Sequence, residues 1–212
     1  MTQGYILMAD IINSRTKDSA ELMEGLKALV TTINKKYKKN ILSPLTITLG
    51  DEFQSIINDL KSCVEIIIKI EEEIVLQHLD FSLRYVVQYG AVDTKINNKV
   101  AYEMLGSGLT MARENLELAK KAKDGRVHFH VMNEADAKLL ENLFFVFTFI
   151  KDSWSRGDYY VVAEFIKGLN YREAAEQLDK DSSQLWKRER SLMIKEYMAT
   201  KRSIIDIVNR LG

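Results

Sequence analysis

One segment organises this chain, and it reads Leu45-Thr46-Ile47-Thr48-Leu49-Gly50-Asp51-Glu52-Phe53-Gln54-Ser55-Ile56-Ile57. Apolar and polar residues alternate on both sides of Gly50-Asp51, which is the period of a half-buried strand. A Gly-Asp pair between two such runs is a signal for a tight turn. The segment therefore predicts a β-hairpin over about residues 45–57, with its tip at Gly50-Asp51.

Two acidic residues are candidates for a metal site. Asp10 follows the apolar run of residues 5–9, which predicts a buried strand over about residues 4–11, and Asp51 lies at the hairpin tip. Turn chemistry alone would explain an Asp at that tip. If the strands are neighbours, the two carboxylates could share one divalent cation, because Mg²⁺ takes one or two carboxylates beside phosphate and water oxygens. Carboxylates that close would also raise the pKa of one of them in the metal-free protein.

Helices and strands are expected to alternate around the hairpin. Helical spacing of apolar residues is found over about residues 18–38, 60–76 and 106–123, and strands are expected over about residues 81–92 and 126–131. The order β-α-β-β-α-β is that of a ferredoxin-like α/β sandwich. His128 and His130 share one face of the last strand, but no third metal ligand lies close by in the sequence. We therefore interpret these two histidines as surface residues.

From about Asn133 the apolar period is helical to the end of the chain, which predicts two domains, residues 1–132 and 133–212. Residues 143–150 could alternatively form a strand because they are rich in aromatic and β-branched side chains. Their length and the apolar stripe that continues through them favour a helix. Phe144, Phe145, Phe147 and Phe149 are more than one helix face can bury, so some should pack on the first domain or on a second subunit.

The last third of the chain predicts an all-α helix-turn-helix domain. A helix over residues 158–167 ends at Gly168. Asn170 and Glu173 then form the pattern of a capping box, and Asp181 is placed to cap a third helix. This arrangement of three helices resembles the helix-turn-helix of bacterial regulators, where the third helix enters the major groove. A final helix is expected over about residues 200–211.

The third helix carries polar and cationic residues that could contact DNA. Ser and Gln can hydrogen-bond base edges, and Lys and Arg can bind phosphates. Leu185, Leu192 and Trp186 are expected to anchor the helix on its other side. The alternative is a basic helix that is only solvated. The groove-facing set would be Ser182, Ser183, Gln184, Lys187, Arg188 and Arg190.

Composition limits the class of protein. Lys plus Arg equals Asp plus Glu at 30 each, so only a local patch could favour nucleic acid. A hydrophobic content of 46% is enough for a packed core. The single cysteine, Cys63, rules out an internal disulfide and indicates a cytosolic setting. A signal peptide is not expected. Nor is a membrane span, because no apolar run approaches roughly 20 residues.

Several segments resemble the class III nucleotidyl cyclases and their diguanylate cyclase (GGDEF) relatives. These are Met8-Ala9-Asp10-Ile11-Ile12-Asn13-Ser14-Arg15, Thr48-Leu49-Gly50-Asp51-Glu52-Phe53, residues 83–92, and Gly106-Ser107-Gly108-Leu109-Thr110-Met111-Ala112-Arg113. Over nearly its full length the chain resembles the SatD family of bacteria, which has a cyclase-like first half and a helix-turn-helix second half. The resemblance implies a nucleotidyl-cyclase-type sandwich that acts as a head-to-tail dimer.

The cyclase resemblance implies a nucleotide site but lacks catalytic residues. Asp10 and Asp51 would hold Mg²⁺ or Mn²⁺ on a nucleotide, and the residues around it would be Asn13, Ser14, Arg15, Gly50 and Glu52. The positions of the cyclase transition-state Asn and Arg hold Thr110 and Glu114, and Arg113 is one residue, about 100°, out of register. Ile47 replaces the base-reading Lys, and Leu49 replaces the first Gly of the GGDEF signature.

Three functions remain open at this point. The first is a cytoplasmic regulator that binds DNA and forms a homodimer, with a degenerate cyclase-like domain that binds nucleotide or metal. The second is an active nucleotidyl cyclase with a C-terminal interaction module. The third is an interaction protein in which neither fold keeps its ancestral activity. Because the expected donors for the transferred phosphate are missing, the residues favour the first over the second.

Overall fold

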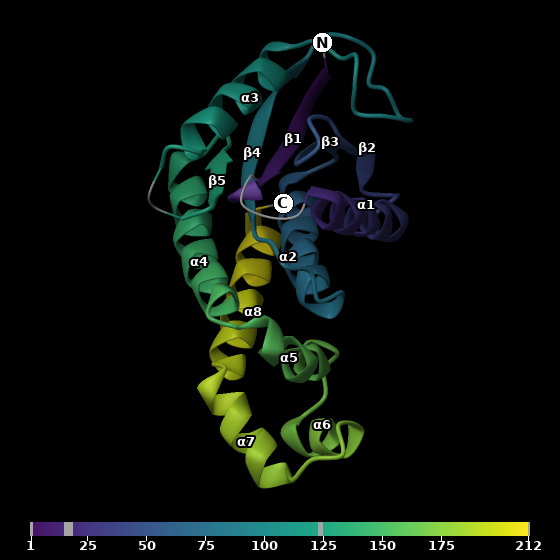
Figure 1. Ribbon diagram of the computed structural model, residues 1–212. Helices are drawn as coiled ribbons and strands as arrows, with labels where there is room; N and C mark the ends of the chain where they lie inside the picture. The colour runs from purple at the N-terminus through teal and green to yellow at the C-terminus, as the bar shows by residue number, and fades with distance from the viewer. Residues whose placement is uncertain (1, 15–18, 123–124, 212) are drawn as a thin grey trace.

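The computed structural model describes residues 2–14, 19–122 and 125–211 (Figure 1). Its strands are β1 (Thr2–Ile11), β2 (Ile41–Ile47), β3 (Glu52–Ile57), β4 (Leu83–Val92) and β5 (Val127–His130). Its α-helices are α1 (Ser19–Lys36), α2 (Leu60–Leu76), α3 (Ser107–Ala119), α4 (Glu134–Asp152), α5 (Tyr159–Ile166), α6 (Tyr171–Gln177), α7 (Ser182–Ser191) and α8 (Ile194–Leu211). A short 3₁₀ helix, η2 (Arg156–Asp158), precedes α5.

The five strands form one mixed sheet in the order β2-β3-β1-β4-β5. The pairs β2–β3, β3–β1 and β1–β4 are antiparallel. Strand β5 is parallel to β4, and α3 connects these two strands. The predicted β-α-β-β-α-β order is therefore confirmed, with one strand added at the edge. The hairpin is also confirmed: Gly50 has φ +85°, in the left-handed region, and Thr48 N–H donates to Glu52 O at 3.0 Å.

Both faces of the sheet are covered by helices. In β1, Leu7, Ala9 and Ile11 pack with α1 and α2, whereas Ile6 and Met8 pack with α3. Successive strand residues point to opposite faces, so β1 is buried on both sides and residues 6–11 are all buried. This explains why β1 reads as a continuous apolar run. In the hairpin, β2 is only partly buried, whereas five of the six residues of β3 are buried.

Two glycines let α3 lie directly on β4. A Cβ added to Gly90 would meet the Cα of Gly108 at 2.5 Å, and one added to Gly108 would meet the Gly90 carbonyl carbon at 2.7 Å. Backbone atoms this close leave no room for a side chain. The Gly-Ser-Gly start of α3 is therefore needed for packing, and it fixes where the rest of α3 lies over the sheet.

The helices after β5 pack back onto the sheet half. Figure 1 shows α4 beside β5 and α8 running alongside α4 toward α2, with α5, α6 and α7 at the far end. Phe144 and Phe147 of α4 are fully buried, and Phe144 lies 5.6 Å from Phe129 of β5, measured between ring centroids. The expectation that some α4 aromatics pack on the first half is thus confirmed. One hydrophobic cluster runs from β1 to α8.

Two local expectations need correction, and the helix favoured for residues 143–150 is confirmed. The last helix begins at Ile194 rather than near residue 200. Trp186 does not anchor α7, because 41% of its surface is exposed, whereas Leu185 and Leu192 are buried as predicted. Residues 143–150 are helical, so the strand alternative is wrong. Among the described residues, no helix has both the length and the apolar character needed to cross a membrane.

Candidate functional site

Charged side chains converge where β1 ends, and we call Asp10, Glu52, Arg84, Arg113 and Lys120 the strand-end cluster. Asp10 lies opposite Glu52 of β3 and opposite Arg84 of β4 in the sheet register. Residues directly opposite one another share a face of the sheet. Arg84 Nη1 donates to both carboxylate oxygens of Asp10, at 3.1 and 2.9 Å. The acid predicted to bind a metal is therefore paired with a cation of the same chain.

Helix α3 supplies the other two cations of the strand-end cluster. Arg113 and Lys120 are seven residues apart, or two turns, so they lie on one side of the helix. Both pair with Glu52, Arg113 through Nη1 and Lys120 Nζ at 2.8 Å. Three cations and two carboxylates thus meet on the face of the sheet that α3 covers. Together they tie β1, β3, β4 and α3 to one another.

Burial and pairing shift the two acids of the strand-end cluster in opposite directions. Burial raises the pKa of Asp10 although Arg84 opposes it. Burial also raises the pKa of Glu52, but hydrogen bonds and charges from Lys120 and Arg113 outweigh it and hold the pKa below its usual value. A raised pKa at one acid was predicted, but from repulsion by Asp51. Its first cause is burial, and the acid that repels Asp10 is Glu52.

Asp51 lies next to β1 but has a different side-chain partner. Ile11 N–H donates to Asp51 O at 2.9 Å, so the backbone of Asp51 lies beside the end of β1, and a shared metal site of the two acids stays a prediction. The Asp51 carboxylate accepts a hydrogen bond of 2.6 Å from Ser14 Oγ. Ser14, Gly50 and Asp51 line a hollow of about 290 Å³ beside the start of α1.

The residues predicted to surround a nucleotide therefore lie in different places. Ser14 and Gly50 share the Asp51 hollow, whereas Glu52 belongs to the strand-end cluster and Asn13 lines a neighbouring hollow of about 400 Å³. Arg15 lies outside the described residues. The prediction that these side chains bind one nucleotide stays a prediction.

The carboxylates of Asp10 and Asp51 suit a divalent cation, but Arg84 competes for Asp10. Asp10 and Asp51 supply the carboxylate oxygens that Mg²⁺ and Mn²⁺ prefer. Both oxygens of Asp10 already accept from Arg84, so an ion that used them would have to displace the guanidinium. Within the described part of the chain, no group of three or more His, Cys, Asp or Glu side chains could hold a metal on its own. A bound nucleotide would have to supply further oxygens.

The catalytic positions of a cyclase hold residues that are used otherwise. Thr110 Oγ1 donates to Gly106 O of its own helix at 3.4 Å, and Glu114 is exposed. Arg113, one residue out of register, is paired with Glu52. None of these three offers a free cation toward the Asp51 hollow.

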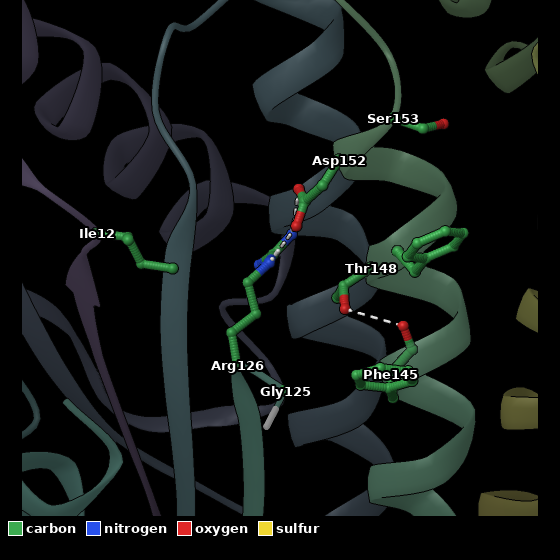
Figure 2. A pocket seen from close by; sticks show the side chains of 8 residues that line it. Ile12, Gly125, Arg126, Phe145, Thr148, Asp152 and Ser153 are labelled. Atoms are coloured by element: carbon green, nitrogen blue, oxygen red, sulfur yellow. Dashed lines mark hydrogen bonds and ion pairs between the residues drawn. The ribbon is translucent and has the colours of Figure 1, made fainter. Parts of the chain in front are cut away.

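A larger hollow, of about 450 Å³, lies between β5 and α4 (Figure 2). Phe145 and Phe149 form its apolar rim and are 54% and 64% exposed. Figure 2 shows Arg126 reaching across toward Asp152. All the polar groups of Arg126 are in use, because it also donates to Glu71 and to Leu83 O. This hollow thus has an apolar rim over a satisfied ion pair. A second subunit against these rings stays a prediction.

The predicted caps of α6 and α7 are confirmed. Asn170 and Glu173 make the capping box at the start of α6, and the Asp181 carboxylate accepts from Ser183 N and Gln184 N. In α7, the residues Ser182, Ser183, Gln184, Lys187 and Arg190 are exposed. Arg190 lies 5.0 Å from the centre of the Trp186 ring, a cation–π distance. Arg188 is held differently, in an ion pair with Asp158.

Sequence reasoning missed Arg84 and Lys120. Arg84 stands alone between buried residues of β4, which is a visible signal, but its partner depends on the register of β1 against β4. Lys120 follows α3 and reads as an ordinary C-terminal charge. Arg113 was noted only for a cyclase role. The roles of these three cations become recognisable only once α3 is placed over the end of β1.

Comparison with known proteins gives one family and several distant structures. The model of the SatD family matches residues 5–208, nearly the whole chain. A search of curated proteins found no significant match. A bacterial light-regulated adenylyl cyclase is 14% identical, with a TM-score of 0.42 over 60% of this chain and 74% of its own. The guanylyl cyclase Cya2 is 10% identical, with a TM-score of 0.36 over 55% and 70%.

A third solved structure, the guanylate cyclase domain of RhGC from Catenaria anguillulae in complex with GTP, is 13% identical. Its TM-score is 0.32 over 52% of this chain and 70% of its own. Similarities this distant carry no functional argument. Function has to be argued from the residues of this chain.

Proposed function

The chain belongs to the SatD family, and from that premise we propose that it is a cytoplasmic regulatory protein that binds DNA through α7. The observation that carries the proposal is the division of α7 into two sides. Leu185 and Leu192 are buried, whereas Ser183, Gln184, Lys187 and Arg190 are exposed. An exposed polar and cationic face on a helix that is anchored from behind is suited to a DNA groove.

Each exposed residue of α7 has a distinct task in this proposal. Lys187 and Arg190 lie three residues apart on one face and bind phosphates. The ring of Trp186 holds Arg190 by a cation–π contact, which limits its loss of side-chain freedom on binding. Ser183 and Gln184 stand at the first turn, where they can reach base edges. Arg188 is not part of this set, because Asp158 neutralises it.

DNA binding is tested by salt titration with the double variant Lys187→Ala/Arg190→Ala. Fluorescence anisotropy on a labelled duplex from upstream of its own gene would give the dissociation constant at several salt concentrations. The parent should bind, and the double variant should lower the slope of log K against log salt by about 2, because two phosphate contacts are lost. The fold should be unchanged, since both side chains are exposed.

A matched control removes two cations elsewhere. Lys38 and Lys39 are exposed beyond the end of α1, and Lys38→Ala/Lys39→Ala changes the net charge by the same amount. This variant should bind DNA as the parent does. The proposal is wrong if the parent binds no DNA at low salt, or if the control loses as much affinity as the α7 variant.

A nucleotide with Mg²⁺ or Mn²⁺ at the Asp51 hollow is a second candidate function. The observation in its favour is that Ser14, Gly50 and Asp51 line one hollow beside the end of β1. Asp51 would bind the ion, with Asp10 once Arg84 is displaced, and the ion would neutralise phosphate charge. Ser14 Oγ donates to Asp51 and so orients its carboxylate.

Binding of a fluorescent GTP analogue with Mn²⁺ measures this second function. Asp51→Asn should weaken it by roughly tenfold, about 1.4 kcal/mol. Asp93→Asn, at an exposed site away from the hollow, should leave it unchanged. Incubation with ATP or GTP and Mn²⁺, followed by product analysis, separates binding from the cyclase alternative. A cyclic nucleotide product would favour the cyclase.

A further inference from the structure

A further hollow lies among the C-terminal helices. Its volume is about 420 Å³, within the range of small-molecule sites. It is formed by the end of α5, the α5–α6 connection, the last part of α7 and the first half of α8. The residues lining it are Phe165, Gly168, Leu169, Asn170, Glu189, Ile194, Lys195, Met198 and Arg202.

A buried carboxylate faces this hollow without a hydrogen bond. Glu189 is only 8% exposed, and its Oε2 is buried with no hydrogen-bond partner. The same Oε2 lies 3.4 Å from Lys195 Nζ, its ionic contact among the described residues, and the Lys195 side chain is itself 70% exposed. Buried carboxylates are normally fully hydrogen-bonded, because leaving them unsatisfied is costly. Glu189 thus lines the hollow with its charge balanced by an exposed lysine, and it can accept a hydrogen bond from a donor outside the chain.

The other residues that line the hollow indicate which kind of ligand would bind there. Phe165 and Ile194 are buried, and Leu169 and Met198 are partly buried, so the wall is apolar. Arg202 is exposed at the same hollow, and within the described residues it makes no hydrogen bond or ion pair. A guanidinium binds a carboxylate through two parallel hydrogen bonds. The hollow therefore offers a carboxylate, a guanidinium cation and an apolar wall together.

We propose that this hollow is a binding site for an apolar α-amino acid. The ammonium group of the ligand donates to Glu189, its carboxylate accepts from Arg202, and its side chain packs on Phe165, Leu169 and Met198. Gly168 leaves the entrance open, because a Cβ added there would meet nothing within 4 Å. The site does not depend on DNA binding by α7.

Isothermal titration calorimetry on the full chain without DNA tests the proposal. The probes are L-leucine, L-methionine and L-phenylalanine, and for the tightest of them its N-acetyl and amide derivatives. At least one amino acid should bind, and both derivatives should bind at least tenfold more weakly, because each removes one charge. Absence of binding by all three at roughly 10 mM overturns the proposal. Equal binding by either derivative does so too.

Matched variants locate the site. Glu189→Gln keeps the side-chain shape and removes the charge, and Arg202→Gln removes the charge at an exposed position where folding is not at risk. Each should weaken binding at least tenfold. Glu196→Gln makes the same chemical change as Glu189→Gln at an exposed α8 residue that does not line the hollow, and should leave affinity unchanged. Unchanged binding by Arg202→Gln would contradict the proposal even if Glu189→Gln failed to fold.

Discussion

At the scale of single residues, Glu71 of α2 is a carboxylate that is completely buried. Arg126 donates to both of its oxygens, at 2.8 and 2.6 Å, and Tyr85 OH donates at 2.6 Å. Lys151 Nζ lies 3.5 Å away. Burial raises the pKa of Glu71, but the charges of Arg126 and Lys151 outweigh it and lower the pKa from 4.5 to about 2.

A lowered pKa makes stability depend on pH in a known direction. Glu71 binds its proton more readily in the unfolded chain, so its contribution is complete above pH 4.5 and is lost as the pH falls toward 2. Replacing Glu71 by Gln should cost about 3–5 kcal/mol at neutral pH, because two buried cations, Arg126 and Lys151, lose one of their carboxylate partners. Urea unfolding of parent and variant should show this difference shrinking between pH 4.5 and 2.

The exposed residue Glu176 provides the control for that measurement. Glu176→Gln should change the free energy of unfolding by less than about 0.5 kcal/mol, and the change should not depend strongly on pH. A Glu71→Gln difference that stays constant down to pH 2 would show that the buried pair is not what the acid disrupts.

At the scale of elements, the position of α3 depends on two glycines. Gly108→Ala would place a methyl group 2.7 Å from the Gly90 carbonyl carbon and 2.9 Å from Ala91 N. The backbone must shift, at a cost of about 1–3 kcal/mol, which exceeds the roughly 1 kcal/mol that Ala gains over Gly in a helix. Urea denaturation should show the loss. Gly157→Ala, whose nearest contact would be an ordinary 3.6 Å, should be near neutral.

Sequence analysis predicts the helices and strands well, but it does not predict all of their bounds or the contacts between them. The helix expected over residues 60–76 is α2 to the residue, because Asp59 caps it and the apolar spacing is regular. The start of α8 was placed six residues late. The break before it is only two residues, Leu192 and Met193; Met193 has φ +51°, and no Gly or Pro marks the break. The strand-end cluster could not be predicted, because it depends on the register of three strands.

At the scale of the whole molecule, the two predicted halves share one core. Phe147 of α4 stacks on Tyr197 of α8 at 4.7 Å, and Tyr197 lies 4.8 Å from Trp154. Lys201 of α8 pairs with Glu72 of α2. Helices of the second half thus pack on elements of the first, α4 on β5 and α8 on α2.

We expect the two halves to unfold together, and the chain carries its own reporters for this. Both tryptophans lie after residue 132, whereas the only cysteine, Cys63, is fully buried in α2. In a Trp186→Phe background, fluorescence reports on buried Trp154 alone. Fluorescence and the reactivity of the Cys63 thiol should give the same urea midpoint. Two different midpoints would mean that the halves are independent domains.

Phe147→Ala is a more stringent test of whether the two halves unfold together, because it removes a side chain that belongs to the second half. Phe147 is fully buried between Phe144 and Tyr197, so its loss should leave a cavity and cost about 3–5 kcal/mol. If one core unites the chain, Cys63 should become reactive at the same lowered urea concentration at which Trp154 fluorescence changes. If Cys63 keeps its original midpoint while Trp154 loses stability, the helices α4 and α8 only rest on the sheet half. The stability of the strand-end cluster would then not depend on them.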